Sequence, residues 1–281
     1  MFKNNELKPY RVVIFDLDGT LLDTEKKLSS ENLYALTRAA ELGILIVPCT
    51  GRFFNGMPDS VKNLPFLKYA VTINGAEVMD TAGNSIYSST MAPDRALELM
   101  EYCRGLGVAY DCYVDNRGYM HKDHIDHIDR YLESPVYQQT VRSMRKPVED
   151  LEALVTRLDR PVQKVQMFIR DRSILLEAYR YISECCPDLI ATSSLTNNLE
   201  INNKDANKAE GLRQLAGSLG FGMDKVMAIG DGGNDVSMIE QAGIGVAMMN
   251  AVDRVRGKAD FITLSCNGSG VAYAINKLIL S

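Results

Sequence analysis

Two aspartates lie one residue apart at the end of a short apolar run near the start of the chain. Residues 12–15, VVIF, have the continuous apolar character of a strand buried on both faces, and DLDGT follows directly at positions 16–20. Carboxylates at the end of a buried strand are costly unless a cation or a reaction uses them. Asp and Gly also form ordinary turns. Acidic and basic residues at the ends of other strands would therefore favour a functional site over an ordinary turn.

Three later segments supply such groups. An apolar run at 44–47 leads into CTGR at 49–52, and another at 226–229 leads into GDGGND at 230–235. Between them, Lys208 opens a stretch that carries leucines at helical spacing. In open α/β sheets, ligands bind outside the carboxyl ends of the strands. We therefore expect these segments to meet in one crevice.

Composition restricts the classes of partner. The chain has 281 residues, of which 46% are hydrophobic and 24% charged, as in ordinary globular enzymes. Its net charge of -5 argues against a nucleic-acid partner, which would favour a basic surface. The first six residues show no apolar signal region, and no apolar run approaches the roughly 18 residues of a membrane span. We expect a cytoplasmic protein without a membrane partner; the sequence does not indicate its oligomeric state.

Strand and helix signals alternate in the first part of the chain, which favours βαβ units and a parallel sheet. The expected elements there are strands at 12–15, 44–47 and 69–73 and helices at 30–42 and 57–64. From residue 82 the pattern changes to helices at 93–106, 149–158 and 173–186, strands at 108–114 and 162–169, and a hairpin turn at 115–118. The parallel pattern is expected to resume with strands at 189–191, 226–229 and 243–247 and to close with a helix at 271–280.

The fold class predicted from this order is α/β, a doubly wound parallel sheet with an inserted α+β unit. We assign residues 1–83 and 189–281 to the sheet core and residues 84–188 to the inserted unit.

The groups at the strand ends suit the hydrolysis of a phosphate monoester. This reaction needs a nucleophile, a proton donor and positive charge against the phosphoryl oxygens. Asp16 fits the nucleophile, which would form an aspartyl-phosphate. Asp18 lies on the same side of an extended backbone, where it can protonate the leaving oxygen and later deprotonate the attacking water.

The same segments offer metal and phosphate ligands. Asp16, Asp231 and the backbone carbonyl of Asp18 form an all-oxygen set suited to Mg²⁺. Asp235 would hold these ligands in place without contacting the ion itself, in part through water. The Thr50 hydroxyl and the backbone N–H groups of Gly51 and Leu17 are candidates to hold phosphate oxygens. Lys208 would supply a positive charge at the start of its helix, where only a nearby anion makes a lysine favourable, and Lys204 is a weaker candidate.

These motifs, in this order, resemble those of the haloacid dehalogenase superfamily and in particular its Cof-type phosphatases. The resemblance rests on Asp16-x-Asp18-Gly-Thr, Thr50-Gly-Arg, Lys208 and Gly-Asp231-Gly-Gly-Asn234-Asp235 and covers nearly the whole chain. It implies a Rossmann-like core, Mg²⁺ dependence, an aspartyl-phosphate, an α/β cap inserted after the third strand, and a phosphate-binding role for Asn234. One departure is the segment Asn267-Gly268-Ser269-Gly270-Val271, where relatives often carry an acid before the Gly-Val pair, so loop contacts there are expected to differ.

Several alternatives stay open within this resemblance. Asp18 argues against a dehalogenase, because halide release needs no proton donor. A phosphomutase of the phosphomannomutase type shares the nucleophile, the acid and the cap, and a phosphate-binding regulator without turnover is a third hypothesis. The substrate is expected to be a small phosphorylated metabolite, such as a sugar phosphate or a flavin-related or pyridoxal phosphate.

Other residue types suggest further sites. Cys49 could act as a nucleophile, but no histidine lies in the flanking segments; the six cysteines are expected to be reduced and mostly buried. His121, His124 and His127 suggest zinc, but their spacing does not place all three on one helical face, and a surface turn into a helix is the simpler interpretation. Candidate substrate-contacting residues in the inserted unit are Arg117, His121, Lys122, Arg130, Lys164 and Arg170.

Overall fold

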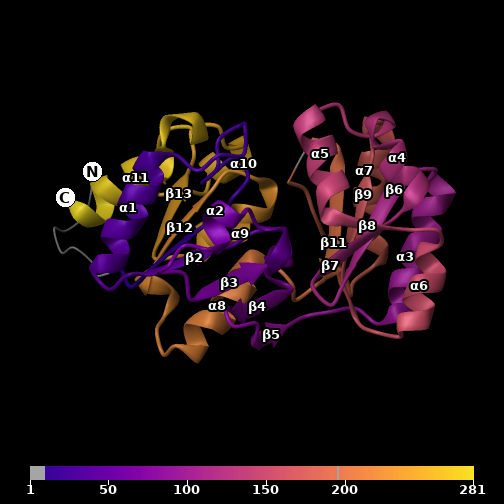
Figure 1. Cartoon of the computed structure of the whole chain (residues 1–281), viewed down its shortest axis with the longest axis horizontal. Coiled ribbons are helices and arrows are strands. Elements are labelled where there is room, and N and C mark those ends of the chain that lie inside the picture. Colours follow the sequence, from indigo (N-terminus) through magenta and orange to yellow (C-terminus); the bar gives the residue numbers. More distant parts are fainter. Residues whose placement is uncertain (1–9, 195) are drawn as a thin grey trace.

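The computed structural model describes residues 10–194 and 196–281. The first six residues, where we expect no signal segment, lie outside this range. Figure 1 shows two halves side by side: one carries the first and last described residues and a parallel sheet, and the other is built on a mostly antiparallel sheet. The predicted fold class, a Rossmann-like core with an added α+β region, is confirmed.

The core half contains a five-stranded parallel sheet in the order β14-β13-β12-β1-β2. Its strands are β1 (Val12–Phe15), β2 (Leu45–Pro48), β12 (Val226–Gly230), β13 (Ile244–Ala247) and β14 (Phe261–Ile262). Strands β1, β12 and β13 are buried along their whole length, as their continuous apolar runs predict. Because β1 pairs with both β2 and β12, the ends of these three strands lie next to one another.

A single parallel bridge between Cys49 and Val71 extends this sheet to a small antiparallel sheet. Its three strands are β3 (Tyr69–Thr72), β4 (Glu77–Asp80) and β5 (Ser85–Ser88). The antiparallel pairing of β3 with β4 and of β4 with β5 was not part of the prediction.

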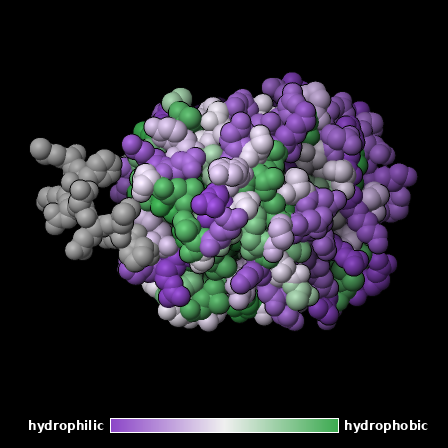
Figure 2. Space-filling view, turned by 60° about the vertical axis from the view of Figure 1, so that its left-hand side comes forward, coloured by the Kyte–Doolittle hydropathy of each residue, from purple (hydrophilic) through white to green (hydrophobic). Residues whose placement is uncertain are grey.

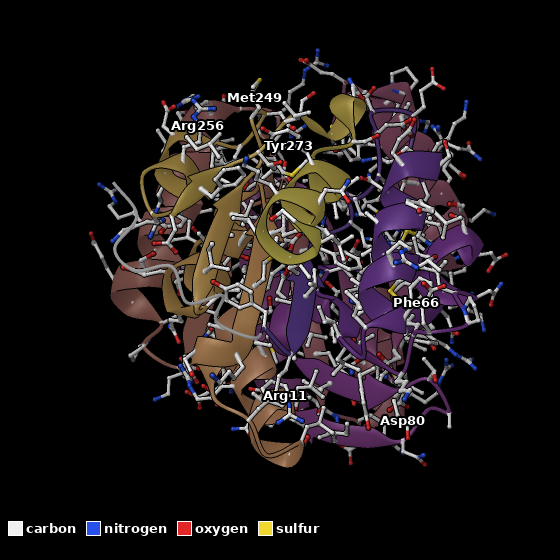
Figure 3. The ribbon with its side chains drawn as sticks, turned by 90° about the vertical axis from the view of Figure 1, so that its left-hand side faces the viewer. Arg11, Phe66, Asp80, Met249, Arg256 and Tyr273 are labelled. Atoms are coloured by element: carbon white, nitrogen blue, oxygen red, sulfur yellow. The ribbon has the colours of Figure 1, made fainter. Side chains whose placement is uncertain are left out.

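Helices cover the core sheet and begin at residues that cap them. Ser29 accepts a hydrogen bond from the Asn32 N–H at the start of α1, and Asn207 accepts one from the Glu210 N–H at the start of α8. The core helices are α1 (Ser30–Glu41), α2 (Asp59–Lys62), α8 (Lys208–Ser218), α9 (Val236–Gln241), α10 (Asp253–Arg256) and α11 (Gly270–Ile275), the last continued by a π-helical turn at Asn276–Leu280. Figure 3 shows the core from the side away from the other half, with α11 and its Tyr273 in front of the strands.

The second half is built on a six-stranded sheet in the order β10-β11-β9-β6-β7-β8. All its pairs are antiparallel except β7 with β8. The strands are β6 (Ala109–Val114), β7 (Arg117–His121), β8 (Arg145–Val148), β9 (Val162–Phe168), β10 (Leu189–Thr192) and β11 (Asn198–Asn203). The helices are α3 (Pro93–Leu106), α4 (Lys122–Asp126), α5 (Pro135–Met144), α6 (Leu151–Leu158) and α7 (Arg172–Cys185).

The prediction that residues 189–191 resume the parallel core sheet is wrong. Strand β10 pairs antiparallel with β11, which pairs antiparallel with β9 of the second half. A short apolar run is compatible with either sheet. Its sequence does not specify the partner strand, which is selected by tertiary contacts. At the other boundary, β5 pairs with β4 although the predicted inserted unit begins at residue 84. The pairing thus places residues 85–88 with the core and 189–203 with the second half, and separate domains remain a prediction.

Each half has its own apolar core, and a small cluster joins them. Buried residues from the parallel strands and α1, α8, α9 and α11 form the first core, and residues of α3, α6 and α7 pack on the second sheet. Phe53, Ile73, Tyr113 and Ala206 form a small cluster between the halves. Figure 2 shows apolar side chains gathered on the face of the core half, while the other half is mostly hydrophilic. Among the described helices, none has the length and apolarity that a bilayer crossing requires.

Candidate active site

Three strand ends bring the predicted site residues together. Phe15 of β1 is level with Pro48 of β2 and with Ile229 of β12. Asp16 therefore leaves the sheet at the same edge as Thr50 and Asp231, each within two residues of its own strand. These three side chains line one cavity of about 90 Å³ together with Asp18 and Asn234.

Lys208 lies at the start of α8, directly behind Asp16. Its Nζ donates to Asp16 Oδ1 at 2.7 Å and to Asp235 Oδ1 at 2.5 Å, and its side chain is completely buried. Burial alone would lower the pKa of this lysine, but the two carboxylates outweigh it and raise the pKa above its usual value. Lys208 is therefore a permanent cation between two acids.

Asp235 is held on both of its oxygens. Besides Lys208 on Oδ1, its Oδ2 accepts from the N–H groups of Asp231 and Gly232, both at 2.8 Å. A completely buried carboxylate with this many donors is well satisfied. It orients the loop that carries Asp231 at the end of β12.

Asp231 and Asp16 line the same cavity, with ligand oxygens within 4.8 Å of each other. Its Oδ1 accepts from the Thr20 hydroxyl at 2.6 Å, while burial and then the charge of Asp235 raise its pKa to about 7. The pKa of Asp16 is also raised, chiefly by burial, although Lys208 opposes the shift. Gly19 is required beside Asp231, because its φ is +86° and a Cβ there would lie 2.4 Å from Asp231 Oδ2.

Asp18 has the opposite electrostatic environment. Arg52 donates to both of its oxygens at 2.7 Å, and Lys26 Nζ lies 2.8 Å from Oδ1. Burial would raise the pKa of Asp18, but these two cations hold it well below its usual range. Asp18 is thus ionised, which is the form that accepts a proton.

The predicted phosphate ligands differ in their placement. Thr50 is buried, and its Oγ1 accepts from the Arg52 N–H at 3.2 Å. Gly51 lines the cavity, and its carbonyl accepts from Lys164 Nζ at 2.9 Å. Leu17 points its side chain into the core, so only its backbone is available to a ligand. Asn234 donates to Asn74 Oδ1 at 3.0 Å at the cavity wall.

Comparison with known proteins assigns the family. A model of haloacid dehalogenase-like hydrolases matches residues 13–275. The chain belongs to the haloacid dehalogenase-like hydrolases. The expected membership of this superfamily, as an enzyme of the phosphatase type, is confirmed.

Relatives of this hydrolase cover nearly its whole length. It is 30% identical to the 5-amino-6-(5-phospho-D-ribitylamino)uracil phosphatase YcsE of Bacillus subtilis over 96% of both chains. It is 27% identical to the phosphatase YwpJ of the same organism, over 96% of this chain and 100% of that one. The structure of a haloacid dehalogenase-like hydrolase from B. subtilis aligns with a TM-score of 0.86 at 27% identity, covering 96% of this chain and 100% of that chain.

One residue that the sequence interpretation missed is Asn74. It lies in the hydrolase's loop after β3, where Ile73, Asn74 and Gly75 all have positive φ. Its backbone N–H donates to the Thr50 carbonyl at 3.0 Å. Its side-chain amide accepts a hydrogen bond from Asn234 and donates one to Glu200. The available signal was the Asn-Gly pair after a predicted strand, which indicates a turn. Asn74 thus connects two of the predicted motifs to β11.

The second half of the hydrolase closes the cavity with buried polar side chains. Lys164 is 1% exposed, lies 3.7 Å from Glu200 Oε2 and 4.3 Å from the Tyr113 ring centre, and is the one predicted substrate-contacting residue that lines the cavity beside Asp16. Arg145, which the sequence did not single out, also lines it and donates to Asp111 at 2.7 Å.

The other predicted contacts lie elsewhere. Arg170 lines an adjoining outer cleft, which also reaches Asp231. The remaining four lie outside the cavity beside Asp16: Arg117, His121, Lys122 and Arg130.

The cysteine and histidine hypotheses find no support in the geometry. Cys49 is completely buried, and burial raises the pKa of its thiol, which keeps it neutral. Within the described residues, the group of three acids at the strand ends is the one cluster whose ligand atoms are close enough for a metal, and it includes no histidine. His121 instead caps the short helix α4 by accepting from the Asp123 N–H, as a turn into a helix predicts.

Proposed function

We propose that this chain is a Mg²⁺-dependent phosphatase that hydrolyses the phosphate monoester of a small metabolite through an aspartyl-phosphate on Asp16. The observation that carries this proposal is the double contact of Lys208 with Asp16 and Asp235. A buried, permanently charged lysine next to Asp16 favours the ionised carboxylate that attacks phosphorus.

The residues present suit a magnesium ion. Oxygens of Asp16, Asp231 and Asp235 lie within 4.8 Å of one another, and Mg²⁺ prefers oxygen ligands. Asp16 and Asp231, with the Asp18 carbonyl, would hold the ion, while Asp235 supports them because protein donors already occupy its oxygens. When bound, the ion would supply positive charge to the phosphoryl oxygens.

The side chains would carry out two transfers. In the first, an Asp16 oxygen bonds to phosphorus, and the bond from phosphorus to the leaving oxygen breaks. In the second, water attacks phosphorus, the Asp16 carboxylate is released, and Asp18 takes the proton of the water. Thr50, Asn234 and the N–H groups of Gly51 and Leu17 would hold the phosphoryl oxygens.

Asp18 needs a proton before it can assist an alkoxide leaving group. Arg52 and Lys26 keep it ionised in the structure. The dianionic phosphate of a bound substrate opposes that negative charge and would favour protonation.

The substrate we propose is a small phosphorylated metabolite. The cavity beside Asp16 is lined by side chains of both halves, and several polar groups converge on it, which suits a small polar metabolite. A sugar phosphate fits this description. A flavin-related phosphate is also to be tested, because the relative from B. subtilis is named for a phosphoribitylamino-uracil.

The experiment is a screen of phosphorylated metabolites with and without Mg²⁺. We expect release of inorganic phosphate only with the ion, and a loss of at least about 10³-fold in Asp16→Asn, since no covalent intermediate can form. Asp126→Asn, at an exposed position of α4, is the matched control and should keep the parent rate. Activity of Asp16→Asn within tenfold of the parent would reject Asp16 as nucleophile. Interconversion of phosphosugar isomers after priming with a bisphosphate, without net phosphate release, would indicate a mutase instead.

A further inference from the structure

A tight turn at residues 23–27, after the DLDGT motif, brings the Lys26 side chain into contact with Asp18. Asp23 Oδ1 accepts from the N–H groups of Glu25 and Lys27 at 2.8 and 2.9 Å, and Lys26 has a φ of 64°, which is rare for a residue with a side chain. The hydroxyl and N–H of Thr24 both donate to Asn267 Oδ1. These two hydrogen bonds attach the turn to the core.

Lys26 also contacts the second half. Its Nζ lies 2.8 Å from Asp18 Oδ1 and 3.2 Å from the hydroxyl of Tyr137, and it sits 4.4 Å from the centre of the Tyr137 ring. Tyr137 belongs to α5, so one lysine joins Asp18 to a helix of the other half. Only 14% of the Lys26 side chain is exposed, which strengthens these contacts.

Helix α5 touches the other cation on Asp18 as well. Arg52 Nη1 lies 3.7 Å from Sδ of Met144, the last residue of α5. Tyr137, Val141 and Met144 also line the cavity beside Asp16, so the helix is its outer wall. In Figure 1, α5 lies on the upper side, and the two connections between the halves, at 89–92 and 204–207, run along the lower side. Opening the halves about these connections would separate Tyr137 from Lys26.

We propose that Lys26 and Tyr137 are positioning residues for the breakdown of the aspartyl-phosphate, an inference that rests on the proposed function. Tyr137 holds Lys26, and Lys26 holds the Asp18 carboxylate in place. In that step the water oxygen bonds to phosphorus, the bond from phosphorus to Asp16 breaks with its electron pair returning to the carboxylate, and the water proton moves to Asp18. The contact with α5 therefore links closure of the halves to release of inorganic phosphate.

The test uses p-nitrophenyl phosphate, whose leaving group needs no proton, so the first transfer does not depend on Asp18 as an acid. With saturating Mg²⁺, we expect kcat to fall about tenfold in Lys26→Met and about threefold in Tyr137→Phe, while kcat/KM stays within about twofold. Rapid acid quenching followed by mass spectrometry should show the phosphorylated protein accumulating in both variants. Lys26→Arg should recover most of kcat, and the double variant should be no slower than Lys26→Met.

The controls separate this inference from the proposed function. Gln139→Ala changes an exposed residue of α5 and should match the parent. Asp16→Asn should form no phosphorylated protein; if it remains active, the proposed function fails whatever Lys26 does. Equal losses in kcat and kcat/KM, unchanged kinetics, or no accumulation of phosphorylated protein in Lys26→Met and Tyr137→Phe would overturn the positioning role.

Discussion

The two halves of the molecule bury charge in different ways. In the core, Lys208 is surrounded by acids: it contacts Asp16 and Asp235, and Asp231 is part of the same cluster. In the second half, buried charges are paired one to one, Arg145 with Asp111 at 2.7 Å and Lys164 with Glu200 at 3.7 Å.

This difference distinguishes the candidate site, in the core, from the side chains of the second half that surround it. Burial, and after it the charge of the neighbouring carboxylates, raises the pKa values of Asp16 and Asp231, which indicates a place where a further cation is favourable. The pairs in the second half compensate each other and need no ion. They provide polar walls whose own charges are already satisfied, apart from Asp111 Oδ1, to which no described residue donates a hydrogen bond.

The largest effect is expected from removing the central cation of the core. Lys208→Met should lower kcat/KM by about 10³-fold, because a buried positive charge beside the reacting groups is lost and two carboxylates are left facing each other. Steady-state kinetics with the best substrate of the screen measure it. Lys204→Met, at an exposed lysine nearby, is the matched control and should stay within twofold. Similar losses in both variants would show that the buried Lys208 contributes no more than an exposed lysine such as Lys204.

An intermediate effect is expected from breaking a pair in the second half. Arg145→Met should lower the free energy of unfolding by about 3–5 kcal/mol, because Asp111 is completely buried and would lose the cation that it contacts directly. Urea unfolding measures the change. The exposed pair of Arg160 with Asp115 offers the control, and Arg160→Met should leave the midpoint nearly unchanged. An unfolding midpoint for Arg145→Met equal to that of the parent would show that the buried pair does not stabilise this half.

The smallest effect concerns pH and the acid cluster. The pKa of Asp231 is about 7 in the folded protein, above its value near 4 in an unfolded chain. The folded, metal-free protein thus holds a proton that the unfolded chain has lost, and its stability falls as pH rises from about 4 to about 7. Since Mg²⁺ needs the deprotonated acids, saturating Mg²⁺ should raise Tm by a few degrees more at pH 8 than at pH 5. Calorimetry that shows equal shifts at both pH values would contradict a metal site at Asp231.

Much of the core site was predictable because it is local to strand ends. Asp16, Thr50 and Asp231 each follow an apolar run, and neighbouring parallel strands end at one edge. Lys208 could be singled out because a lysine at the start of a helix is unfavourable without an anion.

The second half was less accessible to prediction. Helix α5 and strands β8 and β11 were not expected, and β10 was assigned to the wrong sheet. Asn74 and Glu200 are 126 positions apart and come from different halves, so their contact depends on how the halves pack together. The contact of Lys26 with Tyr137 spans 111 positions and has no sequence pattern.

The sequence by itself determined which chemical groups follow the strands: an acidic pair after the first strand, a hydroxyl after the second, a lysine at a helix start, and an acidic loop late in the chain. Tertiary structure alone decided which strand β10 joins, which buried charges pair, and that α5 reaches Asp18 through Lys26. The physical reason is that apolar runs and turns act over a few residues, whereas the partner of a strand or a buried charge is selected by packing between segments distant in the chain.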